Sequence, residues 1–173
     1  AIRSRGLGDV YKRQRLNNIM KIFITGVAGF LGSHLADLMI SEGHSVAGND
    51  NMIGGYTDNV PQNVEFYQID CCDLENMTKA MEGCDVVYHT AATAYEGLSV
   101  FSPVLVTRNI FEASVATITA AIRNKVKRIV YCSSMARYGH HDNVPYKEDY
   151  ECRPQDPYCL LYTSDAADDV HRV

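Results

Sequence analysis

The sequence has no long apolar run and no excess of basic residues. No apolar stretch approaches the roughly 20 residues that a bilayer-spanning helix requires, so we expect no membrane segment. Lys and Arg number 16 against 21 Asp and Glu, which gives a formal net charge of −5. Because phosphate binding requires a basic face, this balance argues against a nucleic-acid partner.

Metal-type cysteine spacing is also absent. The chain has six cysteines, and no two of them form a C-x-x-C pair. We therefore expect neither a metal site nor a disulfide framework. No leader-type segment precedes Met20, so we expect a reducing, cytoplasmic environment.

The composition describes a globular domain, with 173 residues that are 46% hydrophobic and 21% charged. The two ends, however, resemble translated cloning sequence. Residues 4–14 and residues 159–168 can be encoded by the two strands of one transposon-type sequencing adapter. We therefore expect residues 1–14 and 159–173 to be adapter-derived tails around a truncated domain at residues 15–158. The alternative for the first tail is a solvated basic arm.

Short apolar runs alternate with helical periodicity through most of the chain. The pattern predicts strands at residues 21–25, 45–47, 64–69, 86–89 and 127–133, and helices at residues 30–41, 74–81 and 103–124. Asp73 has the side chain to cap the second helix, and Ser102 and Pro103 are typical of the start of the third. Repeated strand–helix–strand units predict an α/β fold, a Rossmann-like doubly wound parallel sheet of about five strands.

Between the last predicted strand and Tyr158 the periodicity is lost. Residues 136–158 are rich in Gly, His, Asp, Pro and Tyr. Irregular stretches of this length in compact domains are usually functional loops, so we expect this one to contribute to a site.

A G-x-x-G-x-x-G motif connects the first predicted strand to the first helix. Gly26 permits the tight turn, Gly29 allows the backbone to approach a pyrophosphate, and Gly32 lets the helix pack against the strand. The N–H groups and dipole of the helix then point at the phosphates. The motif predicts a dinucleotide site.

An acidic residue, Asp50, ends the second predicted strand. A carboxylate at this position can bind both ribose hydroxyls and would repel a 2′-phosphate, which favours NAD over NADP. The alternative is a structural turn followed by a solvated aspartate.

Further candidates follow the third and fourth strands. Asp70 and Cys71 are placed to meet an adenine edge, although Asp70 is equally suited to begin the turn into the next helix. The small residues after His89 allow the backbone to approach a cofactor. We interpret His89 itself as a packed strand residue rather than a catalytic base.

Hydroxyl groups follow the fifth strand. Ligands of open α/β sheets lie beyond the carboxyl ends of the strands, so Ser134 is placed to bond a substrate oxygen. Tyr158 is a candidate acid or base over the same site. Its ordinary pKa of about 10 makes it a poor base unless positive charge lowers that pKa, and a lysine one helical turn later would supply the charge.

These features together resemble the extended short-chain dehydrogenase/reductase family, in its NAD-dependent epimerase/dehydratase branch, with UDP-glucose 4-epimerase-like enzymes the most similar. The resemblance rests on TGVAGFLGSHL, on the end of the second strand, on CSSMARYG and on DPY. It implies that NAD is bound by Gly26, Gly29, Phe30, Leu31 and Gly32 at the pyrophosphate, by Asp50 and Asn51 at the ribose, by Asp70 and Cys71 at the adenine, by Thr90, Ala91 and Ala92 at the nicotinamide half, and more loosely by Asn109. Ser134 and Tyr158 match the catalytic pair.

The resemblance also implies a reaction. Tyr158 as phenolate takes the proton of a sugar hydroxyl while hydride passes to NAD, and the hydride then returns to the other face, so that NAD is not consumed. The expected substrate is a nucleotide sugar, in particular a UDP-sugar. The expected assembly is a homodimer formed through helices.

One departure from the family pattern concerns the catalytic motif. Tyr162 stands where Tyr-x-x-x-Lys requires lysine, and the later strands and the C-terminal substrate domain are missing. The chain is therefore expected to be inactive alone.

Several alternative functions stay open. A nucleotide-sugar dehydratase would need an acid pair beside Ser134, where Met135 and Ala136 stand instead. Another dehydrogenase or reductase of the same family is a further alternative. A non-catalytic NAD-binding regulatory protein would be expected to lack Ser134 or Tyr158.

Overall fold

A computed structural model of the chain describes residues 19–141 and 145–163. Its centre is a five-stranded sheet made of β1 (Lys21–Thr25), β2 (Ser45–Asn49), β3 (Val64–Tyr67), β4 (Val86–His89) and β5 (Arg128–Tyr131). All neighbouring strands run parallel, in the order β3-β2-β1-β4-β5. This is the predicted Rossmann-like arrangement, in which the strand order reverses direction between β1 and β4.

The register aligns the carboxyl ends of the central strands. Thr25 at the end of β1 pairs with Asn49 of β2 on one side and with His89 of β4 on the other. Residues that follow these three strands therefore meet at one edge of the sheet. Ligands of doubly wound sheets bind at this edge.

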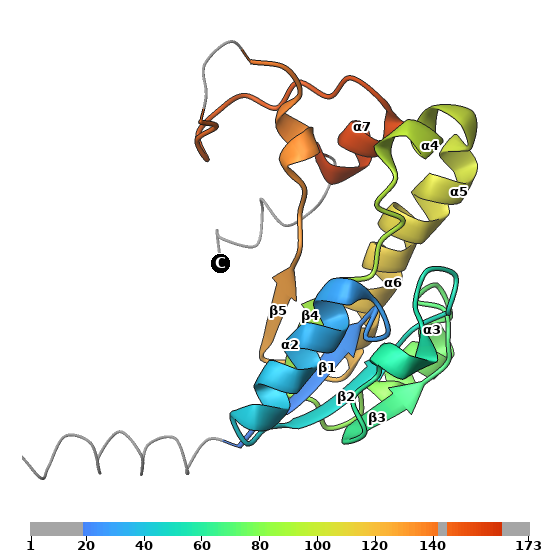
Figure 1. Ribbon diagram of the computed structural model, residues 1–173, viewed down its shortest axis with the longest axis vertical. Helices are drawn as coiled ribbons and strands as arrows, with labels where there is room; N and C mark the ends of the chain where they lie inside the picture. Colours follow the sequence, from blue (N-terminus) through green and yellow to red (C-terminus); the bar gives the residue numbers. More distant parts are fainter. Residues whose placement is uncertain (1–18, 142–144, 164–173) are drawn as a thin grey trace, which may run out of the picture.

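Helices cover both faces of the sheet (Figure 1). α2 (Phe30–Ser41) covers one face, and α3 (Leu74–Ala80) and α6 (Ala113–Arg123) cover the other. Three further helices, α4 (Glu96–Phe101), α5 (Pro103–Thr107) and α7 (Pro157–Thr163), lie beyond the carboxyl edge of the sheet (Figure 1). Shorter 3-10 turns are η1 (Thr57–Asn59) and η3 (Met135–Tyr138), and η2 (Arg108–Glu112) is a π-helical turn. None of the helices within the described residues has the length and apolar character needed to cross a membrane.

Alternation along β1 divides the core into two layers. Ile22 and Ile24 pack with Ala36 on the side covered by α2, whereas Phe23 packs with Met77 and Ala120 on the side covered by α3 and α6. The four residues from Ile22 to Thr25 are almost completely buried. A strand buried on both faces is expected in a parallel sheet covered by helices.

Several predicted elements differ from the structure. β2 continues to Asn49 and not to residue 47, and β5 spans Arg128–Tyr131 and not residues 127–133. β3 ends at Tyr67, so Asp70 lies in the turn that follows and not at the strand end. The helix predicted over residues 103–124 is interrupted by η2 and preceded by α4. Ser102 occupies the N-cap position of α5, but its side chain makes no capping bond, unlike Asp73, which accepts from the Asn76 N–H at the start of α3.

The structure describes part of one predicted tail and none of the other. Residues 1–14 lie outside the described residues. Residues 159–163 lie within them and form most of α7, where Cys159 and Tyr162 are buried. The predicted loop over residues 136–158 thus contains η3 and ends at the first turn of α7.

Candidate functional site

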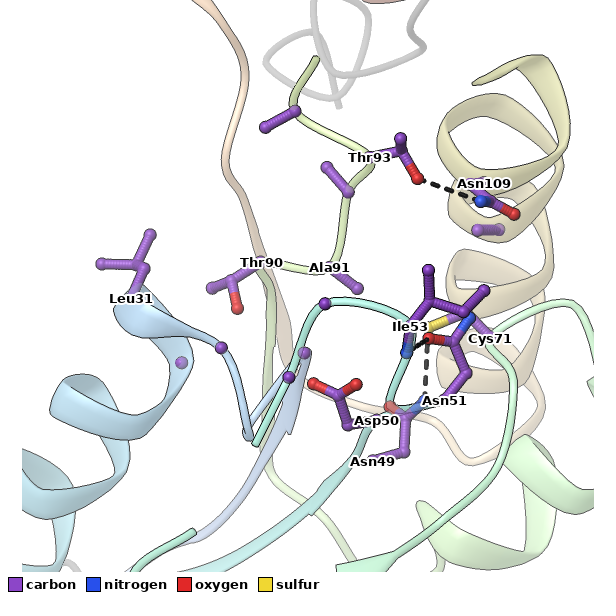
Figure 2. A pocket seen from close by; sticks show the side chains of 18 of the residues that line it. Leu31, Asn49, Asp50, Asn51, Ile53, Cys71, Thr90, Ala91, Thr93 and Asn109 are labelled. Carbon is purple, nitrogen blue, oxygen red and sulfur yellow. Dashed lines mark hydrogen bonds between the residues drawn. The ribbon is translucent and has the colours of Figure 1, made fainter. Parts of the chain in front are cut away.

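A cavity of about 440 Å³ lies at the carboxyl edge of the sheet (Figure 2). The thirteen residues expected to bind NAD all line it: Gly26, Gly29, Phe30, Leu31, Gly32, Asp50, Asn51, Asp70, Cys71, Thr90, Ala91, Ala92 and Asn109. They come from four different connections after β1, β2, β3 and β4 and from η2. The parallel register explains why segments so far apart in sequence converge.

The glycine turn brings backbone atoms into close contact. Gly26 has a φ of +69°, a conformation that favours glycine, and a Cβ there would lie 2.9 Å from Ala91 Cα. A Cβ at residue 32 would lie 2.2 Å from the Gly26 carbonyl oxygen. Phe30 and Leu31 follow in the first turn of α2, whose N–H groups have no acceptor within the helix. This end of α2 is suited to bind an anion.

Asp50 is buried at the floor of the cavity (Figure 2). Its Oδ2 accepts from the Ala28 N–H at 3.2 Å, and its Oδ1 accepts from the Met52 N–H at 2.8 Å. These two bonds hold the carboxylate between the glycine turn and the loop after β2. Asp50 therefore presents a fixed negative charge to the cavity.

Asp70 is held at the rim of the cavity by three donors. Its Oδ1 accepts from the Cys72 N–H at 2.8 Å, and its Oδ2 accepts from Asn51 Nδ2 and from Arg108, both at 3.2 Å. Partial burial acts to raise the pKa of Asp70, but these hydrogen bonds and the positive charge of Arg108 outweigh it and lower the pKa. The two interpretations of Asp70 are thus compatible, since it starts the turn and also lines the cavity.

The neighbouring Cys71 is a buried thiol. Burial raises its pKa to about 11, and its Sγ accepts from Asn49 Nδ2 at 3.3 Å. The thiol is therefore protonated at neutral pH and contributes apolar surface to the cavity.

His89 is a packed strand residue, as the sequence indicates. It is 2% exposed, and burial lowers its pKa to about 4. Its ring bonds to Thr25 and Ser114. The cavity wall next to it is formed by Thr90 and Ala91, whose small side chains leave the backbone accessible.

Asn109 lies in the π turn η2, opposite the loop after β4. Its Nδ2 donates to Thr93 Oγ1 at 2.9 Å, a bond drawn in Figure 2. π turns inside α-helices occur frequently at functional sites. The loose match of Asn109 to the family pattern therefore corresponds to a definite place in the cavity.

The loop after β2 contributes residues that sequence reasoning missed. Ile53, Gly54 and Gly55 line the cavity, and Tyr56 donates its N–H to the Ala28 carbonyl at 3.1 Å. The Gly-Gly pair directly after the acidic strand end was the available signal. Asn49, Thr93, Ala94, Tyr95 and Ala113 complete the lining.

The structure does not place the predicted catalytic pair in this cavity. Ser134 caps η3, and its Oγ accepts from the Ala136 N–H at 3.2 Å. Tyr158 is 7% exposed and packs with Val106 and Ile110. Within the described residues no hydrogen bond joins Ser134 to Tyr158.

The two residues instead flank a second, smaller cavity. Their chain neighbours Met135 and Cys159 line it, together with Glu96, Ala136, Gly139, His140, Tyr146 and Gln155. Tyr95 lines the first cavity and Glu96 the second, so consecutive residues of one segment contribute to both. The catalytic role of Ser134 and Tyr158 stays a prediction.

Known proteins are similar to this chain over most of its length. A UDP-glucose 4-epimerase from Streptomyces lividans is 33% identical over 141 residues, which are 80% of this chain and 43% of that protein. The chain thus spans less than half the length of this relative.

Solved structures give the same picture. The UDP-glucose 4-epimerase of Thermotoga maritima, determined with UDP-glucose, aligns with a TM-score of 0.80 and 31% identity over 84% of this chain and 48% of that one. The Brucella ovis enzyme, determined with NAD, aligns with a TM-score of 0.80 and 29% identity over 83% and 45%.

A family model matches residues 22–161, a span that begins in β1 and ends in α7. It therefore includes the glycine turn, the whole lining of the first cavity and both predicted catalytic residues. The chain belongs to the NAD-dependent epimerase/dehydratase family.

Proposed function

We propose that the chain is the NAD-binding part of a nucleotide-sugar 4-epimerase that acts on UDP-sugars. The main support for this proposal is that all thirteen residues expected to bind the cofactor line one cavity. The relatives named above, each a UDP-glucose 4-epimerase, support the reaction and substrate class.

The groups that line the cavity fit NAD from end to end. The start of α2 offers N–H groups and the helix dipole to the pyrophosphate, and Asp50 offers its carboxylate to the adenosine ribose. We assign Asp70, which lines the cavity, to the adenine edge. Thr90, Ala91 and Ala92 leave open backbone for the nicotinamide half. We assign NAD rather than NADP because a 2′-phosphate would meet the buried charge of Asp50.

Bound NAD would supply reversible hydride transfer to and from the sugar carbon whose configuration is inverted. In this proposal the Tyr158 phenolate takes the proton of the sugar hydroxyl and the resulting phenol later returns it, and Ser134 donates a hydrogen bond to the same oxygen. The tyrosine hydroxyl must lose its proton near neutral pH, which requires nearby positive charge.

In this sequence residue 162, where the family pattern has the lysine that supplies this charge, is tyrosine. α7 places residue 162 one turn beyond Tyr158, and the two tyrosine rings lie with centroids 4.9 Å apart. A lysine at this position would place its positive charge on the same side of α7 as Tyr158. With Tyr162 there instead, we infer that the chain alone is inactive and that the longer gene product carries the activity.

A stripe of exposed apolar side chains supports the homodimer. Val104, Phe111, Val115 and Ile122 lie on one side of the α5–η2–α6 helix and are 82%, 41%, 49% and 68% exposed. Exposed apolar surface of this kind marks interaction sites, and the same stripe on a second copy would cover it. Dimerisation that persists in the double variant Phe111→Arg/Val115→Arg, measured by light scattering, would contradict this assignment.

The cysteines bear on the compartment. All six are free thiols, a state that a reducing environment would maintain. We infer a cytoplasmic enzyme.

Cofactor choice gives the first test. Calorimetric titration of the chain should show NAD binding that is at least about tenfold tighter than NADP binding, because Asp50 opposes the extra phosphate. Asp50→Asn should weaken NAD binding about tenfold and reduce the preference for NAD over NADP. Asp58→Asn, at an exposed carboxylate of η1, is the matched control and should change neither. Equal affinities for both dinucleotides would overturn the assignment.

The reaction is tested on the longer gene product. We expect it to interconvert UDP-glucose and UDP-galactose without net formation of NADH. Failure to turn over any nucleotide sugar, together with net NADH formation from another alcohol, would favour the dehydrogenase alternative.

A further inference from the structure

The imidazole of His89 lies behind the first cavity, where it bonds to β1 and to α6. It lies at the end of β4 and is 2% exposed. Its Nδ1 is 2.8 Å from Thr25 Oγ1 on β1, and its Nε2 is 3.1 Å from Ser114 Oγ on α6. No lining residue of the cavity takes part in either contact.

The bonds of Thr25 fix which nitrogen carries the proton. Its hydroxyl oxygen accepts from the N–H groups of Thr90 and Ala91, each at 3.1 Å. A hydroxyl has two lone pairs and one proton, so two accepted bonds leave only the proton for His89. Thr25 therefore donates to Nδ1, and Nδ1 is unprotonated.

The other side of the ring follows from this assignment. A neutral imidazole with a bare Nδ1 carries its proton on Nε2 and donates it to Ser114. The Ser114 hydroxyl in turn donates to the Ile110 carbonyl inside η2. The Tyr131 hydroxyl lies 3.3 Å from the same serine oxygen. Burial keeps the ring neutral, since it lowers the pKa of His89 to about 4.

The hydrogen bonds thus form one directed chain. It starts at the backbone of Thr90 and Ala91, which line one wall, and ends in η2, which carries Asn109 on the other wall. The hydrogen bond from Asn109 to Thr93 connects η2 to the loop after β4 a second time. The two walls are therefore joined both across the cavity and behind it.

We propose that His89, held as the Nε2–H tautomer, is a positioning residue that couples the loop after β4 to the π turn and so sets the width of the nicotinamide side of the cavity. The link to NAD rests on the proposed function. The coupling of the two walls rests on the geometry alone. A purely structural role would instead require only that the buried polar atoms are satisfied, with no effect of one end on the other.

The tautomer is tested on the 173-residue chain without any ligand. Long-range ¹H–¹⁵N correlation spectra at pH 7 should show a neutral ring with an unprotonated Nδ1 and a protonated Nε2. A protonated Nδ1, in either a neutral or a charged ring, would overturn the proposal.

The coupling is tested with Ser114→Ala, which removes the far end of the chain of bonds. We expect amide hydrogen exchange at Thr90 and Ala91 to accelerate about tenfold, although Ser114 touches neither residue. Thr119→Ala is the matched control, because the Thr119 hydroxyl makes the same kind of bond to a carbonyl four residues earlier on the exposed side of α6. Faster exchange confined to η2 and α6 would overturn the coupling.

NAD affinity gives an independent readout. Thr25→Val should weaken NAD binding about tenfold, and Thr25→Ser, which keeps the hydroxyl, should restore it to within about twofold. Equal affinity of Thr25→Val and the unmodified chain would overturn the positioning role. If the unmodified chain binds no NAD, the proposed function fails, while the tautomer and exchange results still decide whether His89 couples the walls.

Discussion

The first cavity and the segment after β5 are held by different kinds of contact. Around the cavity, backbone groups and buried carboxylates fix the geometry, with Gly26 and Gly32 packed against each other and Asp50 bonded to two N–H groups. After β5, η3 and α7 depend on side-chain packing, in which Tyr158 and Tyr162 rest on the α5–η2 helix. The first region is thus fixed by its backbone, whereas the geometry of the second depends on which side chains pack there.

The largest expected effect is in the backbone of the first region. Gly32→Val would place a Cβ 2.2 Å from the Gly26 carbonyl oxygen, which no rotamer relieves. We expect a loss of about 5 kcal/mol in the free energy of unfolding, measured with urea, and loss of NAD binding by calorimetry. Gly97→Ala, in α4 where a Cβ meets nothing within 4 Å, is the control and should be neutral. Unchanged stability in Gly32→Val would show that the turn is not rigid.

The second prediction separates chemistry from cofactor binding. Tyr158→Phe keeps the ring that packs on Val106 and Ile110 and removes only the hydroxyl. In the longer gene product we expect the epimerisation rate to fall about thousandfold, with NAD affinity unchanged. Tyr67→Phe, whose hydroxyl bonds to Glu65 on the outer strand, should leave the rate unchanged. A parallel loss of NAD affinity in Tyr158→Phe would show that the first cavity and the segment after β5 do not act separately.

The same division explains what the sequence could predict. Parallel pairing aligns strand ends, so a residue that follows an apolar run can be placed at the sheet edge from local pattern alone. Gly26, Asp50 and Thr90 were placed in this way. Even an error of two residues in the end of β3 left Asp70 in the cavity lining.

Contacts between distant segments could not be predicted in this way. Arg108 meets Asp70 across 38 positions of the chain, and no periodicity signals such a pair. The π turn adds a residue to a helix whose apolar pattern is continuous. α7 is held on the α5–η2 helix by tertiary packing, so the position of Tyr158 relative to Ser134 depends on contacts that the sequence pattern does not encode.

The third prediction concerns the pH dependence of stability and the hydrogen bonds of His89 that link the two cavity walls. His89 has a pKa of about 4 when folded, against 6.5 for the free side chain, so the unfolded chain binds its proton first. As pH falls from 6.5 toward 4, the free energy of unfolding should therefore fall by about 3 kcal/mol from this group. The groups that face the ring are Thr25, Ser114 and Tyr131, of which only the tyrosine titrates.

His89→Gln isolates that contribution. Urea unfolding at pH 6.5, 5.5 and 4.5 should show a smaller decline in the variant than in the unmodified chain. Equal slopes would mean that the folded protein protonates the ring readily, and the walls of the cavity would then separate at mildly acidic pH.

The smallest expected effect lies at the rim, where the first region is most exposed to solvent. Arg108→Gln removes an ion pair whose side chains are 46% and 27% exposed, so we expect a loss below about 1 kcal/mol in stability. Because Asp70 also loses one of its three donors, NAD affinity should fall about twofold. Arg123→Gln breaks an ion pair with Glu75, whose side chains are 44% and 75% exposed and which lies outside the cavity lining. Because this pair is more exposed, its loss should cost no more stability than Arg108→Gln, with no change in NAD affinity. If both variants bind NAD like the unmodified chain, Asn51 and the Cys72 N–H alone hold Asp70, and the rigid part of the site ends at the backbone.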